Sequence, residues 1–512
     1  MRRFLLPFAT ALALAAPGAQ AFCGFYAGKA DASLFNEASQ VVVARDGQRT
    51  TLSLLNDYKG PLNEFALVVP TPTVIRQGQV RIAEKATFER LDGYSAPRLA
   101  EYHDSDPCRL DWRWGWQPPP PMAAMSRAAP AAARPRSARD EALGVRVEAQ
   151  YTLEEYDIVS LSAEQSDGLE TWLRENGYRI PAGASAALRP YIQQGMKFFV
   201  AKVNLQAQAQ TGYTMLRPLQ FSFQSEKFML PMRLGMLNAP PGKPQDLIVY
   251  LLTREGRVES SNYRTVPLPA NMNLPSFVKP RFAEFYRAMF DEQARQAEHR
   301  VVFTEYFWDM AWCDPCAAQP LTAEELHKAG ATWAAGVSQA QPVVLTRLHV
   351  RYTPETFPED LMFTQTRDRQ NWQARYVIQN PHQGSVAQCD AKLAQADCEA
   401  MCKPRVETVL RYQGSPWARN QPDLPRSTDP QVLTRDCAAA CQAAKRDGVA
   451  RAARYYERDL PARIAAEKQT LARLTGWSLA QIDAMPDARK FTEAAARVQA
   501  PWWRRLFVTE TP

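Results

Sequence analysis

Two cysteines in the segment Trp312-Cys313-Asp314-Pro315-Cys316 have a spacing that supports chemistry most directly. Two thiols this close in sequence can exchange disulfides, hold half of a metal site, or close a small local disulfide. No second close pair of cysteines or histidines accompanies them, since His327 stands alone. We therefore expect a structural disulfide or packed thiols here, with redox activity and metal binding as alternatives.

The elements expected around this pair decide between these alternatives. A strand over 299–308 would precede it and a helix over 322–329 would follow, an order that resembles the redox site of thioredoxin-like proteins. There the first cysteine lies at a helix N-terminus, which lowers its pKa. Pro320 would interrupt such a helix. In the redox alternative Cys313 would be the nucleophile and Cys316 the resolving thiol.

A second cysteine pattern points to a helical hairpin. Cys398 and Cys402 are four residues apart, as are Cys437 and Cys441, so each pair lies on one helix face. Two antiparallel helices would pair Cys398 with Cys441 and Cys402 with Cys437. This arrangement resembles the twin-cysteine helical hairpins of small oxidised proteins, and a four-thiolate zinc site is its rival.

The chain has nine cysteines, so at least one thiol is left over. Cys389 lies nine residues before Cys398 and would face away from it on one continuous helix. We therefore expect Cys389 to be the odd thiol. By elimination, Cys23 and Cys108 would form the remaining disulfide.

A group of possible ligands lies at His103-Asp104-Ser105-Asp106-Pro107-Cys108. We interpret it as a turn whose carboxylates cap backbone amides, with a metal site as the alternative. We expect no metal and no cofactor, because none of the common nucleotide, hydrolase or metalloprotease motifs occurs. A hydrolase with a site assembled in space remains a weaker possibility.

The first 21 residues are typical of a secretory signal peptide. Arg2 and Arg3 precede a short apolar stretch, and Ala19-Gln20-Ala21 is a cleavage site. We expect an exported bacterial protein, periplasmic or secreted, in an oxidising compartment. No later segment is apolar enough to span a membrane. The segment Trp502–Phe507 could make weak membrane-surface contact.

The charge distribution argues against a nucleic-acid partner. Lysine and arginine number 61 against 54 acidic residues, a formal charge of +7, and the two signs are mixed along the chain. A nucleic-acid-binding surface would need a concentrated basic stripe.

Hydrophobic patterning predicts an α+β protein: largely antiparallel sheet with helices, followed by a disulfide-linked helical region. Asp46-Gly47 predicts a hairpin turn, Asp429-Pro430 a helix start, and Thr475-Gly476 a helix end. The expected regions are a signal peptide (1–21), a β-rich region (22–116), a disordered Pro/Ala/Arg-rich loop (117–142), an α+β core (143–385) and a helical region (386–512).

Several motifs together resemble an uncharacterised family of exported bacterial proteins, domain of unknown function 2330. The motifs are Cys23-Gly24-Phe25-Tyr26, Lys29-Ala30-Asp31, Leu34-Phe35-Asn36, Ala38-Ser39-Gln40-Val41, Phe65–Pro70, Tyr94–Leu99, Glu155–Ile158, Gly195–Val200, Ala311–Cys316 and Leu474–Trp477. The resemblance implies no catalytic residue or ligand. We therefore expect a binding or cell-envelope-associated structural protein, with a thiol–disulfide oxidoreductase as the alternative.

Overall fold

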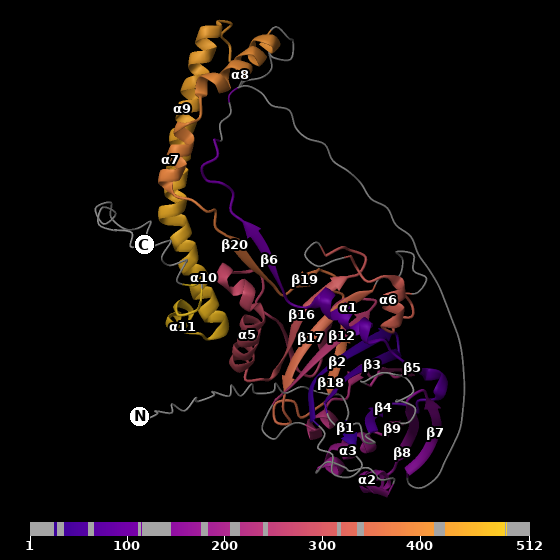
Figure 1. Ribbon diagram of the computed structural model, residues 1–512. Helices are drawn as coiled ribbons and strands as arrows, with labels where there is room; N and C mark the ends of the chain where they lie inside the picture. The colour runs from indigo at the N-terminus through magenta and orange to yellow at the C-terminus, as the bar shows by residue number, and fades with distance from the viewer. Residues whose placement is uncertain are drawn as a thin grey trace, which may run out of the picture. The chain divides into compact units, whose positions relative to one another are not determined.

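The computed structural model describes residues 25–27, 35–59, 66–110, 114, 145–175, 183–204, 216–238, 244–314, 319–334, 343–413, 425–486 and 488. They form two compact units (Figure 1). Unit 1 is built from Met1–Pro97, Ala128–Leu268 and Ala294–Ala374, and unit 2 from Arg98–Arg127, Pro269–Gln293 and Arg375–Pro512. Each unit thus combines three separate stretches of the chain. The expected signal peptide and the 117–142 loop lie outside the described residues.

The predicted α+β fold is confirmed, and the largest sheet lies in unit 1. Its strand order is β14-β16-β17-β12-β2-β3-β10-β5, and β19 pairs with β16. These strands are β2 (Phe35–Asp46), β3 (Arg49–Lys59), β5 (Val80–Ile82), β10 (Leu219–Gln224), β12 (Gln245–Thr253), β14 (Arg264–Pro267), β16 (Val301–Asp309), β17 (Val344–Tyr352) and β19 (Trp372–Gln373). Within this sheet, the described pairings are antiparallel except β12–β2 and β14–β16, which are parallel.

The hairpin predicted at Asp46-Gly47 joins β2 to β3. Asp46 pairs with Arg49, and Gly47 has a φ of 57°, which a glycine adopts without strain. The turn therefore sets the register of two central strands.

A second sheet packs against the first within unit 1. Its order is β1-β4-β9-β8-β7, formed by β1 (Phe25–Ala27), β4 (Ala66–Thr71), β7 (Val145–Leu153), β8 (Tyr156–Ala163) and β9 (Lys197–Val203). Val249 of the large sheet and Phe199 of the second belong to one buried cluster, so the two sheets share a core. Phe198 points the other way, into a cluster with α2 (Ser166–Glu175) and α3 (Ala184–Gln193).

The outer face of the large sheet is covered by two helices, α1 (Lys85–Ser95) and α6 (Ala323–Lys328). Unit 1 also holds a small sheet of order β11-β18-β13. Its strands are β11 (Met229–Leu230), β13 (Val258–Ser260) and β18 (Leu361–Gln365).

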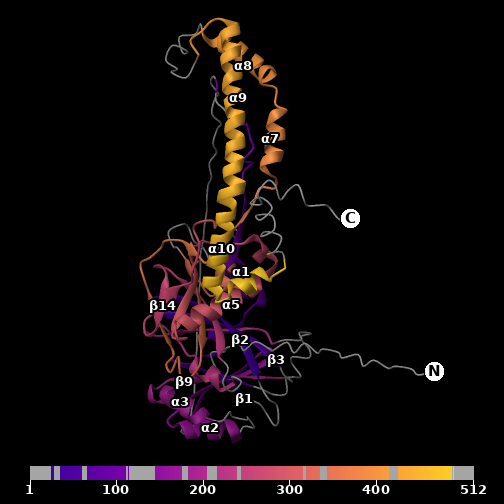
Figure 2. The same cartoon turned by 90° about the vertical axis from the view of Figure 1, so that its left-hand side faces the viewer.

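Unit 2 combines a small parallel sheet with long helices (Figures 1 and 2). The sheet order is β15-β20-β6, with β6 (Arg98–His103), β15 (Met272–Leu274) and β20 (Arg375–Asn380). The helical elements are η3 (Ser276–Arg281), most of α5 (Phe282–Gln296), α7 (Val386–Ala394), α8 (Cys398–Gln413), α9 (Pro430–Arg454), the π-helical turn η5 (Tyr455–Asp459), α10 (Leu460–Thr475) and α11 (Leu479–Asp483). Among the described residues, no helix is long and apolar enough to span a bilayer.

The longest helical stretch begins and ends where the sequence predicts. Asp429 caps α9 by accepting a hydrogen bond from the Gln431 amide, and Pro430 occupies the first turn. Elements α9, η5 and α10 follow without a break, and Gly476 ends α10 in the left-handed conformation with a φ of 73°. Figure 2 shows this stretch as one column, which we call the long helix.

The predicted hairpin disulfides are confirmed. Cys398 bonds Cys441 and Cys402 bonds Cys437, joining α8 to α9. All four cysteines are buried, together with Leu433 of α9.

The predicted pairing of Cys23 with Cys108 is wrong, because Cys108 bonds Cys389. Cys389 is therefore not the odd thiol. The prediction assumed one helix through Cys389 and Cys398, but α7 ends at Ala394 and α8 begins at Cys398. The break allows both cysteines to face α9, and Cys389 lies beside the Gly448 carbonyl. Cys23 is outside the described residues.

Candidate functional site

The loop after β16 exposes the Cys313 thiol. The Cys313 Sγ donates to Gln319 Oε1 at 3.4 Å, and the neighbouring Trp312 is 61% exposed. Asp314 is buried and anchors the loop by accepting hydrogen bonds from Tyr306 and Gln373. Cys313 has no disulfide partner among the described residues, and Cys316 lies outside them.

The helix expected after this loop is present, but its N-terminus is already capped. α6 starts at Ala323, and Thr322 and Glu325 form a capping box. The helix begins well after Cys313, so its N-terminal amides interact with Thr322 rather than with that thiol. The described residues therefore give Cys313 an exposed position, and the N-terminus of α6 does not lie at this thiol as it would in a thioredoxin-like site.

A buried ionic cluster lies on the large sheet of unit 1. A β-bulge between Thr304 and Tyr306 leaves Glu305 as an extra residue on β16. Glu305 is fully buried, with its two oxygens 2.7 Å from His349 Nδ1 and 2.5 Å from Arg347 Nε. The bulge thus brings a carboxylate to two basic side chains of β17.

Opposite charges lie next to one another in this cluster, in which Arg347 also contacts Asp92 at 2.7 Å. Asp246 of β12 binds Arg351 through two hydrogen bonds of 2.8 Å and lies 3.4 Å from His349 Nε2. Burial alone would lower the pKa of His349, but Glu305 and Asp246 outweigh it and raise that pKa to about 9. Burial likewise would raise the pKa of Asp246, but the nearby His349 and Arg351 cations lower it to about 2. His349 is therefore a buried cation held by two carboxylates, and removal of one partner would leave an uncompensated buried charge.

The acidic motif at 103–108 organises unit 2. Asp104 accepts two hydrogen bonds from Arg463 of α10, at 2.9 and 2.8 Å, and others from Gln379 and Tyr455. Asp106 accepts from the Cys108 amide at 2.7 Å, as a turn-capping carboxylate does, and from Lys392. Within the described part of the chain, no group of three or more His, Cys, Asp or Glu residues is placed to hold a metal ion.

The π-helical turn positions two tyrosines beside this motif. Pro461 lacks an N–H, so the α-helical bond to the Glu457 carbonyl cannot form and the turn widens. Tyr455 donates to Asp104, and Tyr456 lies 2.9 Å from His382 Nδ1. Turns of this kind often occur at functional sites.

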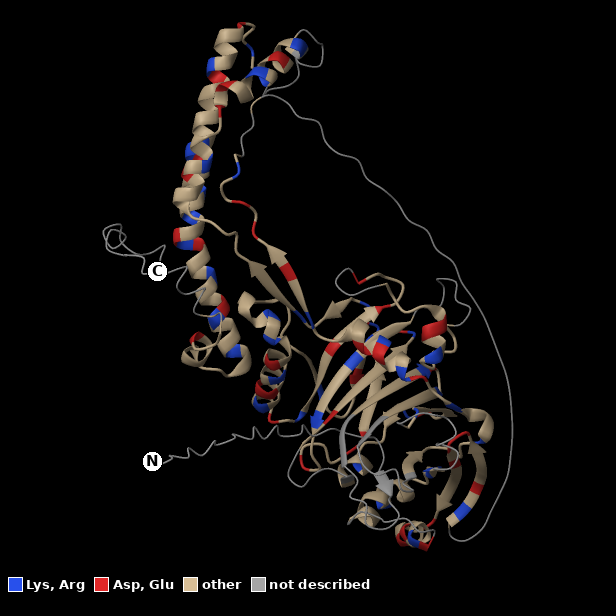
Figure 3. Cartoon of the chain, in the orientation of Figure 1, with Lys and Arg blue, Asp and Glu red and all other residues tan. Residues whose placement is uncertain are grey.

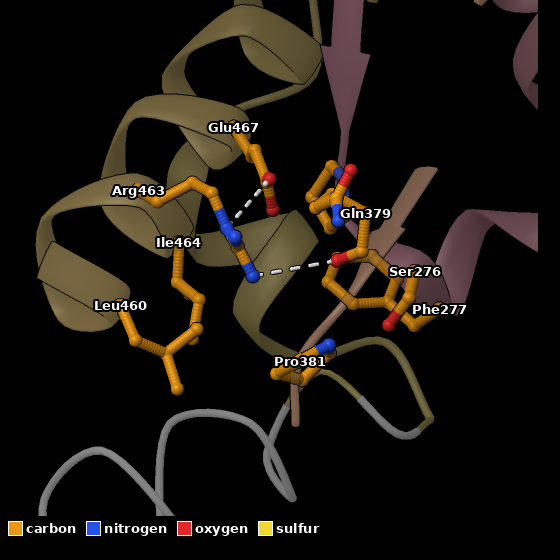
Figure 4. A pocket seen from close by; sticks show the side chains of 9 residues that line it. Ser276, Phe277, Gln379, Pro381, Leu460, Arg463, Ile464 and Glu467 are labelled. Carbon is orange, nitrogen blue, oxygen red and sulfur yellow. Dashed lines mark hydrogen bonds and ion pairs between the residues drawn. The ribbon is translucent and has the colours of Figure 1, made fainter. Parts of the chain in front are cut away.

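A shallow depression lies next to these residues in unit 2 (Figure 4). It is lined by Pro275, Ser276, Phe277, Gln379, Pro381, Leu460, Arg463, Ile464 and Glu467. Figure 4 shows the Arg463 guanidinium between Glu467 and Gln379, with the apolar side chains of Leu460, Ile464 and Pro381 below it. The free volume is about 10 Å³, enough for one group of the size of a water molecule.

Glu467 is the unusual residue of this depression. It is only 5% exposed, and its Oε1 has no hydrogen-bond partner among the described residues. Arg463 Nε lies 3.4 Å from this oxygen, without the geometry of a hydrogen bond. Burial raises the pKa of Glu467 to about 7, because the attraction of Arg463 only partly offsets it and Asp104 adds to it.

We take the depression as the candidate site because it combines a cavity with a carboxylate that lacks a hydrogen bond. Sequence reasoning singled out Asp104 and Asp106 but missed Arg463 and Glu467, which lie more than 350 positions later. Pro461 after Tyr455-Tyr456 was the local signal for an irregular helix at this point. The sequence contains no signal that pairs α10 with the motif at 103–108.

A comparison with known families assigns the chain. A family model described as an uncharacterised protein conserved in bacteria, DUF2330, matches residues 17–364. The chain belongs to this family. The resemblance inferred from the motifs is confirmed, but Leu474–Trp477 lies beyond the matched residues. The DUF2330 match also ends before α7, so it does not include the disulfide-linked helices.

Other comparisons add little. No curated protein matches the chain. Among solved structures, a mutated baculovirus P35 after caspase cleavage is 10% identical, with a TM-score of 0.20. The matched region covers 43% of this chain and 65% of the P35 chain. A similarity at this level carries no argument about fold or function.

Proposed function

We propose that this DUF2330 protein is exported and acts in the bacterial cell envelope as a binding protein, with unit 2 as its binding element. The observation that carries the proposal is the set of three disulfides, Cys108–Cys389, Cys398–Cys441 and Cys402–Cys437, all within unit 2. Such bonds form and persist in oxidising compartments. They support export, in agreement with the signal peptide expected over residues 1–21.

The form of unit 2 supports a binding role. The long helix contains three consecutive elements of 25, 5 and 16 residues, which corresponds to about 70 Å at 1.5 Å per residue. Disulfides attach α7 and α8 within this helical region, α7 through Cys389 and α8 through two bonds to α9. Figure 3 shows acidic and basic residues interspersed along the long helix. A rigid helix of this kind holds a binding surface in a fixed shape, which lowers the entropic cost of association.

Expression of the full chain in a bacterium tests the proposal. We expect the protein in the periplasmic fraction, with an intact mass that shows cleavage after Ala21. The six disulfide cysteines should resist alkylation until a reductant is added. A chain that begins at Phe22 behind a new Met is the control, and its thiols should be alkylated in the cytoplasm. Full-length, uncleaved protein with six reactive thiols in the cytoplasm would contradict the proposal.

A thiol–disulfide oxidoreductase is the second candidate, favoured by the exposed Cys313 thiol beside an exposed Trp312. Measurement of the reduction potential of the Cys313–Cys316 pair separates the two functions. A potential below about −300 mV is typical of a structural disulfide. A much higher potential, with disulfide-exchange activity that C313S abolishes, would replace the binding proposal.

A further inference from the structure

The depression in unit 2 contains an unmet electrostatic requirement. Glu467 Oε1 is buried and accepts no hydrogen bond from a described residue. A buried polar atom left in this state costs about 1–3 kcal/mol, and more when it carries charge. A group that donates a hydrogen bond to this oxygen would remove that cost.

The local charges indicate which donor is missing. Arg463 gives two hydrogen bonds to Asp104, so one guanidinium serves two carboxylates, Asp104 and Glu467. The next basic residue along α10, Lys468, instead contacts Asp483. When Glu467 is ionised, the group formed by Asp104, Arg463 and Glu467 carries a net charge of −1. A single additional cation would balance it.

The size and walls of the depression limit the form of that cation. The free volume accommodates one group of the size of a water molecule, which an ammonium group matches. Leu460, Ile464, Phe277 and Pro381 supply apolar surface at the same place. A short alkyl chain attached to the ammonium would lie against these side chains and bury apolar area.

We propose that this depression binds a primary ammonium group on a short alkyl chain, with Glu467 as its acceptor. The ammonium donates to Glu467 Oε1, and the alkyl chain contacts Ile464 and Leu460. A free alkylamine and a lysine side chain share this chemistry. The inference rests on the binding role proposed above, and it names the ligand class for one site in unit 2.

Thermal unfolding of the full-length, oxidised protein at pH 8 tests the inference. The probes are pentylammonium chloride and lysine blocked at both backbone ends, each compared with potassium chloride at equal ionic strength. We expect an amine probe to raise the melting temperature of unit 2 by at least about 2 °C at saturation. Stabilisation by pentylammonium alone would identify a free amine as the source, and stabilisation by blocked lysine would identify a side chain.

Two variants and a matched control make the test specific. E467Q keeps the shape of the side chain but removes the charge, and should lose the amine-dependent shift. I464W keeps the carboxylate but fills the depression, and should also lose it. E457Q removes an exposed carboxylate from the adjacent π-helical turn and should keep the full shift.

Three results would overturn the inference: no shift with either amine, an equal shift with potassium chloride, or an equal shift in E467Q and E457Q. Each of these would leave the export and oxidation measurements unaffected. Failure of the ammonium site is therefore distinguishable from failure of the proposed function.

Discussion

Glu467 and His349 are both buried, but their surroundings favour opposite charge states. His349 lies between two carboxylates, so its pKa rises to about 9 and the cation is retained. Glu467 has one shared guanidinium for a partner, so burial raises its pKa to about 7 and the neutral acid is favoured. In the first arrangement the buried cation has two anionic partners, and in the second one carboxylate oxygen has no hydrogen-bond donor among the described residues.

Replacing His349 should destabilise unit 1 in a pH-dependent way. H349Q leaves Glu305 with Arg347 as its charged partner, and we expect a loss of about 3 kcal/mol in the free energy of unfolding at pH 6. The folded pKa is raised, so the contribution is complete below about pH 6.5 and is lost as pH rises through about 9. Urea unfolding at several pH values measures it. The control H103Q replaces an exposed histidine and should change the free energy of unfolding by less than about 0.5 kcal/mol. A loss of stability in H349Q that is constant from pH 6 to 10 would contradict the prediction.

Replacing Glu467 should have the opposite pH dependence. The folded pKa of this acid is raised from 4.5, so wild-type stability falls as pH rises from about 4.5 through about 7. The charged groups that face Glu467 are Arg463 and, behind it, Asp104. Without added amine, E467Q should match the wild type at pH 4 and exceed its stability by about 1–3 kcal/mol at pH 8. Thermal unfolding from pH 4 to pH 8, with E457Q as the control, tests this prediction. Equal pH profiles of stability for E467Q and the wild type would refute it.

At the scale of elements, irregularities place the important side chains. The bulge in β16 directs Glu305 to β17, the break between α7 and α8 lets Cys389 reach Cys108, and the π-helical turn brings Tyr455 to Asp104. The hairpin disulfides were predictable because a four-residue spacing depends only on helix periodicity. The break after Ala394 was not, because a short Gln-Ala-Asp segment has no strong helix-breaking residue.

The two disulfides between α8 and α9 should account for much of the stability of these helices. In C402S/C437S one of the two bonds is lost while Cys398–Cys441 still closes the same hairpin, and we expect a decrease of about 2–3 kcal/mol in the free energy of unfolding of unit 2. Circular dichroism during thermal unfolding measures the loss. C313S, which removes an exposed thiol, should leave the transition unchanged. Equal stability of the two variants would show that packing and the remaining Cys398–Cys441 bond are enough to hold α8 on α9.

At the scale of the whole molecule, the chain passes between its two units several times. Strands β6 and β20 are 272 or more positions apart in sequence and pair in one sheet of unit 2. All disulfides among the described residues lie in this unit. The two units therefore differ in what stabilises them: a large sheet sandwich in unit 1, and covalent bonds between helices in unit 2.

A reductant should consequently affect the two units unequally. We expect dithiothreitol to increase amide hydrogen exchange in α7, α8 and α9 of unit 2 by at least about tenfold. Exchange in β12 and β17, at the centre of unit 1, should stay within about twofold. Hydrogen-exchange mass spectrometry of oxidised and reduced protein provides both values at once. A similar increase in both units would show that they unfold cooperatively.

The sequence by itself determined the features that depend on local periodicity and capping. These are the α+β class, the hairpin at Asp46-Gly47, the ends of the long helix at Asp429 and Gly476, and the disulfides between α8 and α9. The tertiary structure alone decided which distant segments meet: Cys108 with Cys389, Glu305 with His349, and Asp104 with Arg463 beside Glu467. Local rules act over a few residues, whereas these contacts depend on how strands and helices from 44 to more than 350 positions apart pack together. The exposed Cys313 was found from the sequence, but the depression at Glu467 required the fold.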